Sequence, residues 1–99
     1  MPARPAESER VMKTVRTYEI PEQTRFVVGL TAGAEVLCVQ TQHDKPHLWV
    51  RMSTGHPTES RRFIVAGTGR ELPPDAGRYV GTFQLAGRDL VYHVFEVAD

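Results

Sequence analysis

The side chains with the widest chemical range in this chain are its histidines and its single cysteine, Cys38. His43 and His47 bracket the turn HDKP with Asp44 between them, and imidazole and carboxylate groups at such spacing can bind a metal ion. No HExxH or CxxC motif accompanies them. We therefore expect exposed loop histidines, with no bound metal and no other cofactor.

The remaining reactive groups also favour structural roles. Cys38 and His93 lie inside apolar runs, which offer neither a helix N-terminus nor a neighbouring cation to activate a thiol. Cys38 is therefore expected to be a small, buried apolar residue. Gly67-Thr68-Gly69 lacks the lysine and the following helix of a phosphate loop, and no GxSxG motif is present. The carboxylates form no evident acid–base pair. The sequence therefore predicts a protein that is not an enzyme.

Arginine is the cation that this chain uses most, with ten arginines and two lysines. Residues 51–88 contain three acidic residues and six arginines, at positions Arg51, Arg61, Arg62, Arg70, Arg78 and Arg88. The whole chain has a formal net charge of zero, so the basic character is local. Such a face can meet an acidic protein or a phosphate backbone. Binding of nucleic acid or of an anionic ligand through this face is therefore the alternative hypothesis.

Trp49 is the only tryptophan, and its run HLWVRMS alternates between apolar and polar residues. Leu48, Val50 and Met52 are expected to face inward, so Trp49 points outward, either under a second sheet or onto a contact surface. Tryptophan and arginine contribute most to many protein interfaces. The sequence therefore predicts a partner-binding site at Trp49, Arg51, Arg61 and Arg62, with the last two across a hairpin from the first two.

Seven short apolar or alternating runs follow one another, each closed by a turn signal. They span Lys13–Ile20, Arg25–Leu30, Ala34–Gln42, His47–Ser53, Arg61–Ala66, Tyr79–Leu85 and Leu90–Val97. Connections of mostly three to seven residues favour antiparallel neighbours, because a parallel crossover needs a dozen residues or more. The predicted fold is all-β, a small antiparallel β-sandwich or a partly open barrel.

Finer features of this fold are also predicted. Ala34–Gln42 is apolar on both faces in its middle and is expected to be central in its sheet or sandwiched. Leu90–Val97 is apolar on both faces and is expected to be a central, buried strand. Gly67–Arg78 is the longest link, and we expect the chain to change sheets there, with a short helical turn around Pro74–Gly77. The sequence AGRD is expected to form the loop of a hairpin between the last two strands. The predicted core residues are Leu48, Val50, Phe63, Val65, Phe83, Val91, Phe95 and Val97.

The length of the chain and the composition of its N-terminal residues limit the number of domains and the expected location of the protein. A chain of 99 residues allows one domain, and one cysteine excludes an internal disulfide. Residues 1–11 combine two prolines with mixed charges, so we expect a dispensable arm, and Met12 is a second candidate start. No signal peptide and no run of 18 apolar residues is present, so we expect a cytoplasmic protein without a membrane span.

Four strand motifs carry a resemblance that covers Met12–Val97: MKTVRTYEIP, LCVQTQ…P-x-LWV, RRFIVAGTG and YVGTFQ…LVYHVFEV. The chain resembles a family of small uncharacterised proteins of phages, prophages and bacterial genomes. This resemblance implies a compact β domain in a mobile-element context, with no assigned activity, catalytic residue or cofactor. The leading interpretation is a non-enzymatic protein-interaction module of phage or prophage origin. Its partner would be another protein or a second copy of the chain.

Overall fold

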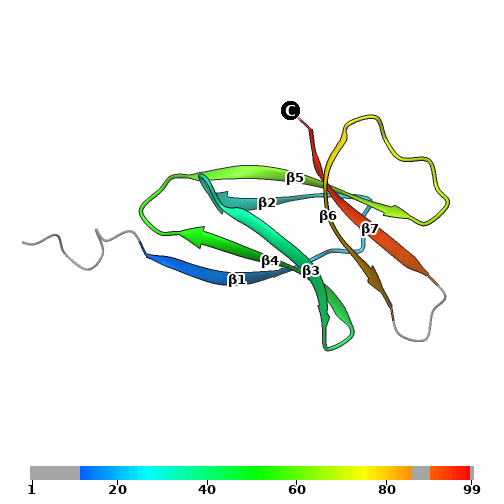
Figure 1. The fold of residues 1–99 in the computed structure, drawn as a ribbon, viewed down its shortest axis with the longest axis horizontal. Coiled ribbons are helices and arrows are strands. Elements are labelled where there is room, and N and C mark those ends of the chain that lie inside the picture. Colours follow the sequence, from blue (N-terminus) through cyan, green and yellow to red (C-terminus); the bar gives the residue numbers. More distant parts are fainter. Residues whose placement is uncertain (1–11, 86–89, 99) are drawn as a thin grey trace, which may run out of the picture.

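The chain folds into two antiparallel β-sheets in the computed structural model, which describes residues 12–85 and 90–98 (Figure 1). The strands are β1 (Lys13–Glu19), β2 (Arg25–Thr31), β3 (Glu35–Gln42), β4 (Lys45–Ser53), β5 (Thr58–Gly67), β6 (Ala76–Gln84) and β7 (Val91–Val97). One sheet has the order β1-β4-β3 and the other β2-β5-β7-β6. The described residues contain no helix, and the strands do not close into a barrel. The predicted all-β class is confirmed.

Each predicted run corresponds to one strand, and the differences lie at the ends. The loop between β3 and β4 is shorter than predicted, because His43 and Asp44 both adopt positive φ angles of 52° and 62°. Gln42 and Lys45 pair directly across this two-residue turn. Positive φ at both central positions matches the twist of antiparallel strands, so the ladder continues up to the turn.

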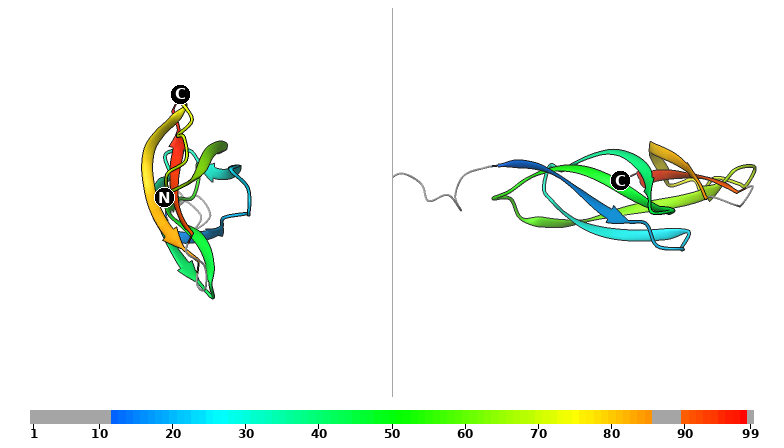
Figure 2. Two further views of the ribbon diagram at one scale, coloured as in Figure 1. Left: turned by 90° about the vertical axis from the view of Figure 1, so that its right-hand side faces the viewer. Right: turned by 90° about the horizontal axis from the view of Figure 1, so that it is seen from below.

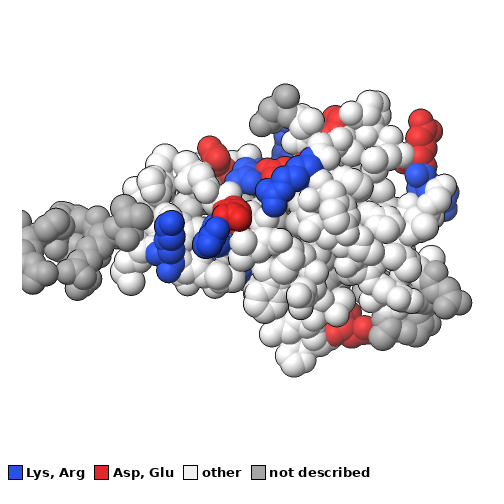
Figure 3. All heavy atoms as spheres, viewed as in Figure 1, with Lys and Arg blue, Asp and Glu red and all other residues white. Residues whose placement is uncertain are grey.

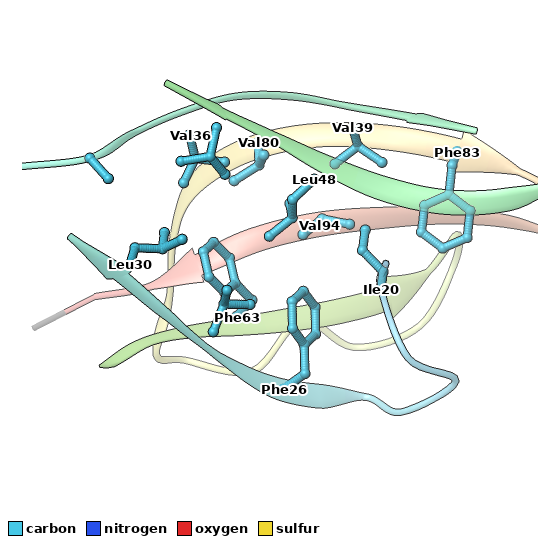
Figure 4. Close-up of a cluster of buried hydrophobic side chains, with 13 residues drawn as sticks. Ile20, Phe26, Leu30, Val36, Val39, Leu48, Phe63, Val80, Phe83 and Val94 are labelled. Atoms are coloured by element: carbon cyan, nitrogen blue, oxygen red, sulfur yellow. The ribbon is translucent and has the colours of Figure 1, made fainter. Parts of the chain in front are cut away.

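The hydrophobic core fills the space between the two sheets (Figure 4). Leu48 and Val50 of β4 and Phe63 of β5 are completely buried, as the alternation of their strands predicts. Phe26 stacks on Phe63 with ring centroids 5.1 Å apart. Further core side chains come from every other strand except β1: Val28, Leu30, Val36, Val39, Val80, Phe83 and Val94.

The core face of β7 is the opposite of the predicted one. Val94 is buried and Tyr92 packs against the core, whereas Val91, Phe95 and Val97 are only half-buried. The register explains the difference, because Val94 lies opposite Val65 and so shares the inner side of the sheet. Since this run is apolar on both faces, alternation alone cannot select the inner one. Val65 itself is partly buried and packs against the core.

The chain changes sheet at three short links, not at the long one. The links 20–24, 32–34 and 54–57 each connect strands of different sheets. The long link 68–75 instead joins β5 and β6 within one sheet, because β7 later inserts between them. This link contains no helix but has one turn near the predicted place, in which the Ala76 amide donates to the carbonyl of Pro73, and β6 already begins at Ala76. β7 is central as predicted, but β3 is an edge strand.

The two sheets approach each other closely on the side of β3 and β6. Arg61 Nη1 and Arg78 Nη2 of the four-stranded sheet donate to the carbonyls of Ala34 (2.8 Å) and Val36 (2.7 Å). A Cβ atom at Gly81 of β6 would lie 2.9 Å from the Cβ atom of Val39. On the other side β1 and β2 are the outermost strands of their sheets. The sandwich is therefore closed along one side and open along the other (Figure 2).

Some predicted features lie outside the described residues. These are the arm Met1–Val11 and the AGRD loop, which includes Arg88. The strands that flank this loop pair as predicted, down to Gln84 opposite Val91. The part of the chain that the structure describes contains no helix long and apolar enough to cross a membrane.

Candidate protein-binding surface

Trp49 lies on the outer face of the three-stranded sheet, in its central strand β4. The register places Thr17 of β1 on one side of it and Cys38 of β3 on the other. The outward orientation is as predicted, and the second sheet packs on the opposite face, against Leu48 and Val50. The indole Nε1–H is shielded from solvent and has no acceptor among the described residues. An indole N–H usually has a partner when it is shielded, so this donor is unusual.

A β-bulge in β3 adds apolar surface beside Trp49. Val36 pairs with Val50 and Val39 with Leu48, and both valines point into the core. Two residues, Leu37 and Cys38, therefore stand opposite the single Trp49, and both are directed outward. Leu37 is 40% exposed. Cys38 is half-buried, not fully buried as the sequence suggested.

We call this surface the Trp49 face and define it as Val15, Thr17, Leu37, Cys38 and Trp49. Val15 lies on β1 opposite Arg51 and is 51% exposed. The face is thus apolar in its middle and crosses all three strands of the sheet. An apolar centre with a polar margin is the usual make-up of a protein interface.

Charged pairs border the Trp49 face at both ends. At one end Arg51 forms an exposed ion pair with Glu35 across the β3–β4 ladder. The hydrogen bond from Arg51, and secondly its charge, lowers the pKa of the Glu35 carboxyl below its ordinary value of 4.5. At the other end Lys45 Nζ lies 3.8 Å from the Glu19 carboxylate.

The structure does not bring Arg61 and Arg62 to this surface. Both belong to β5 in the other sheet, because the link 54–57 changes sheet and does not form a hairpin. Arg61 points inward and forms a bidentate pair with Glu96, with Nη2 2.9 Å from Oε1. Arg62 pairs in register with Val27 on the outer face of the four-stranded sheet. Of the four predicted site residues, only Trp49 and Arg51 lie together.

Residues 12–99 match a family that is described as a domain of unknown function, DUF7352. The chain belongs to this family. The match includes all seven strands and the whole Trp49 face. No curated protein matches the chain, and no solved structure does.

The arginines that the structure describes in this DUF7352 domain do not form one face. Arg51 pairs with Glu35, Arg61 with Glu96, and Arg78 donates to the carbonyl of Val36 on β3. Elsewhere Arg25 binds Asp75 through two hydrogen bonds of 2.8 and 2.9 Å. On the described part of the surface in Figure 3, blue and red side chains accordingly lie next to each other.

The histidines form no metal site within the described residues of the DUF7352 domain. His43 and Asp44 form the β3–β4 turn, and His47 Nδ1 lies 3.0 Å from the carbonyl oxygen of Lys45.

A hydrogen-bonded network surrounds His93, and the sequence did not predict it. His93 Nε2 is 2.7 Å from Thr68 Oγ1, and Nδ1 is 2.8 Å from Thr82 Oγ1, which also contacts Tyr79. Thr68 Oγ1 donates onward to the carbonyl of Val91. The network joins the long link to β6 and β7. Pairing of residues distant in sequence creates it, so local patterns give no signal for it.

Proposed function

We propose that this DUF7352 domain is a non-enzymatic protein-interaction module that binds a protein partner through the Trp49 face. The observation that carries the proposal is the bulge in β3, which turns Leu37 and Cys38 outward beside Trp49. A partner that covers this face would bury a tryptophan, the residue type most enriched among energetically dominant interface positions.

The borders of the face support a protein ligand of mixed polarity. Arg51 with Glu35 and Lys45 with Glu19 place both signs of charge around the apolar centre. Exposed pairs of this kind contribute little to stability, but they favour complementary partners and disfavour others. A nucleic-acid ligand would instead gain most from unpaired cations gathered on one side.

We further propose a phage or prophage origin and a cytoplasmic location. The four strand motifs that resemble proteins of mobile elements support the origin, and the lone thiol of Cys38 is compatible with a reducing compartment. The neighbouring genes test the origin, since tail, capsid or anti-defence genes beside this one support it. Neighbours restricted to ordinary chromosomal genes across several genomes contradict it.

Site-specific photo-cross-linking in cells tests the binding surface. A cross-linking amino acid replaces Gln40, an exposed residue of β3 that follows Cys38 by two positions and lies opposite His47. The matched control replaces Gln84, an exposed glutamine on β6 in the other sheet. We expect a discrete protein adduct from position 40 that Trp49→Ala removes, and no such adduct from position 84.

Two outcomes would contradict this proposal. Equal adducts from both positions, or adducts that survive Trp49→Ala, would separate binding from the Trp49 face. Adducts that nuclease treatment removes, and that weaken steeply as salt rises, would favour the nucleic-acid alternative.

A further inference from the structure

Within residues 12–85 and 90–98, β1 presents an unpaired edge along the open side of the sandwich. It is the outermost strand of its sheet, and all of its residues are exposed except Tyr18, which is half-buried. The right-hand view of Figure 2 looks at the molecule from below and shows β1 uncovered at the front. An edge of seven regular residues is a template for pairing with a further strand.

The hydrogen bonds to β4 define which backbone groups of β1 remain available. Ile20 N donates to the carbonyl of Pro46, and Thr54 N donates to that of Met12. Both contacts continue the register of β1 against β4, so the even-numbered residues of β1 form its hydrogen-bonded pairs. The amide and carbonyl groups of Lys13, Val15, Thr17 and Glu19 therefore point toward the open edge.

We infer that β1 pairs with β1 of a second copy of the chain, antiparallel, with Arg16 opposite Arg16 on the two-fold axis. This inference rests on the proposed role in protein binding and names the partner of the β1 edge. In this register Lys13 lies opposite Glu19 of the second copy, and Val15 lies opposite Thr17. A surface that meets its own copy about a two-fold axis gives a closed dimer.

Charge complementarity selects this register. Lys13 and Glu19 are the two charged residues on the outer side of β1, and symmetry makes their pair occur twice. Opposite charges directly across a ladder are favourable, and so are pairs of β-branched residues such as Val15 and Thr17. An axis at Val15 or at Thr17 would instead place Lys13 opposite Thr17, or Glu19 opposite Val15. Neither alternative matches the charges.

The same register satisfies the free backbone groups. The pairs 13 with 19 and 15 with 17 join residues whose amides and carbonyls both point to the open edge, so each pair exchanges two hydrogen bonds. Arg16 opposite Arg16 is the unfavourable element, since like charges face each other there. The interface is also small, and both features favour a weak, reversible dimer.

The dimer would join two Trp49 faces into one surface. A two-fold axis perpendicular to the sheet keeps the outer faces of both copies on the same side. Thr17 lies beside Trp49 in its own chain and beside Val15 of the second copy. The three-stranded sheets then form one six-stranded sheet, which presents both tryptophans to a single partner.

Sedimentation equilibrium of the full chain, up to about 1 mM, tests the pairing. We expect reversible dimers, and we expect Lys13→Glu and Glu19→Lys each to weaken them about tenfold, because each change makes two attractive pairs repulsive. An equimolar mixture of the two variants should regain a dimer, since acidic positions of one then face lysines of the other. Arg16→Gln should strengthen the dimer.

Thr17→Pro gives a matched test of the backbone. The amide of Thr17 makes no bond to β4, so proline there removes an edge donor and leaves the ladder to β4 intact. We expect a folded monomer, with folding checked by circular dichroism, whereas Trp49→Ala should remain dimeric. A monomeric wild type, or dimers that persist in Thr17→Pro, would overturn the inference. Either result leaves the Trp49 face to be tested by the cross-link at position 40.

Discussion

Arg61 illustrates how much the role of one residue depends on its surroundings. Its side chain and that of Glu96 are 17% and 18% exposed, and Arg61 also donates to the carbonyl of Ala34. The sequence indicated a surface cation for partner binding. In the structure Arg61 links β5 to β7 and to the start of β3, because β5 directs it toward the core layer. Alternation with Phe63 places Arg61 on the inner side of β5, but no local pattern in RRFIVA predicts its pairing with Glu96 of β7.

Loss of one partner should therefore destabilise the fold. Glu96→Gln leaves the Arg61 charge largely shielded and without its carboxylate, so we expect a loss of about 2–3 kcal/mol, less than for a fully buried pair. The control Glu59→Gln changes an exposed carboxylate on β5 and should stay within about 0.5 kcal/mol of wild type. Urea denaturation measures both. An equal effect of the two substitutions would contradict a structural role for the pair.

Two surface carboxylates should make the free energy of unfolding depend on pH in the acidic range. The hydrogen bond from Arg25 lowers the pKa of Asp75 below its ordinary 3.8, and Arg51 lowers that of Glu35 below 4.5. Each group binds protons less readily in the folded state, so its contribution is present above the ordinary pKa and is lost as pH falls through the folded one. The expected loss of stability therefore lies below about pH 4.5.

Denaturation curves between neutral and acidic pH check this expectation. The difference in stability between wild type and Asp75→Asn should shrink as pH falls. The difference in stability between wild type and Arg25→Gln should shrink with falling pH in the same way. The double variant should lose no more stability than either single variant, because all three remove the same interaction. A difference that stays constant with pH would show that the pair contributes through packing and not through charge.

At the scale of the elements, β7 gives the sharpest contrast between prediction and structure. Seven strands were predictable because each has a short apolar run bounded by turn residues. The inner face of β4 was also predictable, since Leu48 and Val50 alternate with polar neighbours. The run LVYHVFEV has apolar residues at both odd and even positions, so only its pairing with β5 decides that Val94 points inward. The bulge at Leu37 likewise arises from the pairing of β3 with β4.

This reversal of faces has a measurable consequence. Phe63 is fully buried and stacked on Phe26, so Phe63→Ala should cost about 3–5 kcal/mol. Phe95 lies half-buried on the outer face, edge-on to Tyr79 with ring centroids 5.6 Å apart. Phe95→Ala should therefore cost only about 1–2 kcal/mol. Thermal or urea unfolding of the two variants compares them directly. Equal losses would place the side chain of Phe95 in the core after all.

At the scale of the whole molecule, the two sides of the sandwich differ in kind. Along β3 and β6 the sheets touch, and two arginines cap carbonyls of the β3 edge. Along β1 the edge has no cover among the described residues. Covered edges are protected from further pairing, and open edges are available for it. The two candidate binding surfaces adjoin on β1, since β1 contributes Val15 and Thr17 to the Trp49 face.

Closure along β3 and β6 depends on Gly81, which gives the last prediction. A Cβ atom there would lie 2.9 Å from the Cβ atom of Val39 and 3.0 Å from its amide nitrogen. Neither atom is the end of a flexible side chain, so Gly81→Ala must push β3 away from β6 and strain the two arginine contacts. We expect a loss of about 1–3 kcal/mol in urea denaturation, as for other overpacked sites.

Gly29→Ala is the matched control, because it adds the same methyl group to a strand of the same sheet. Its Cβ atom would lie 3.3 Å from Cγ2 of Thr58, an exposed side chain that can move away. We expect that variant to stay within about 1 kcal/mol of wild type. Similar losses for both glycines would mean that the approach of β6 to β3 is not what closes the sandwich. A loss at Gly81 alone would show that the close approach of β6 to β3 closes the side of the sandwich opposite the open β1 edge.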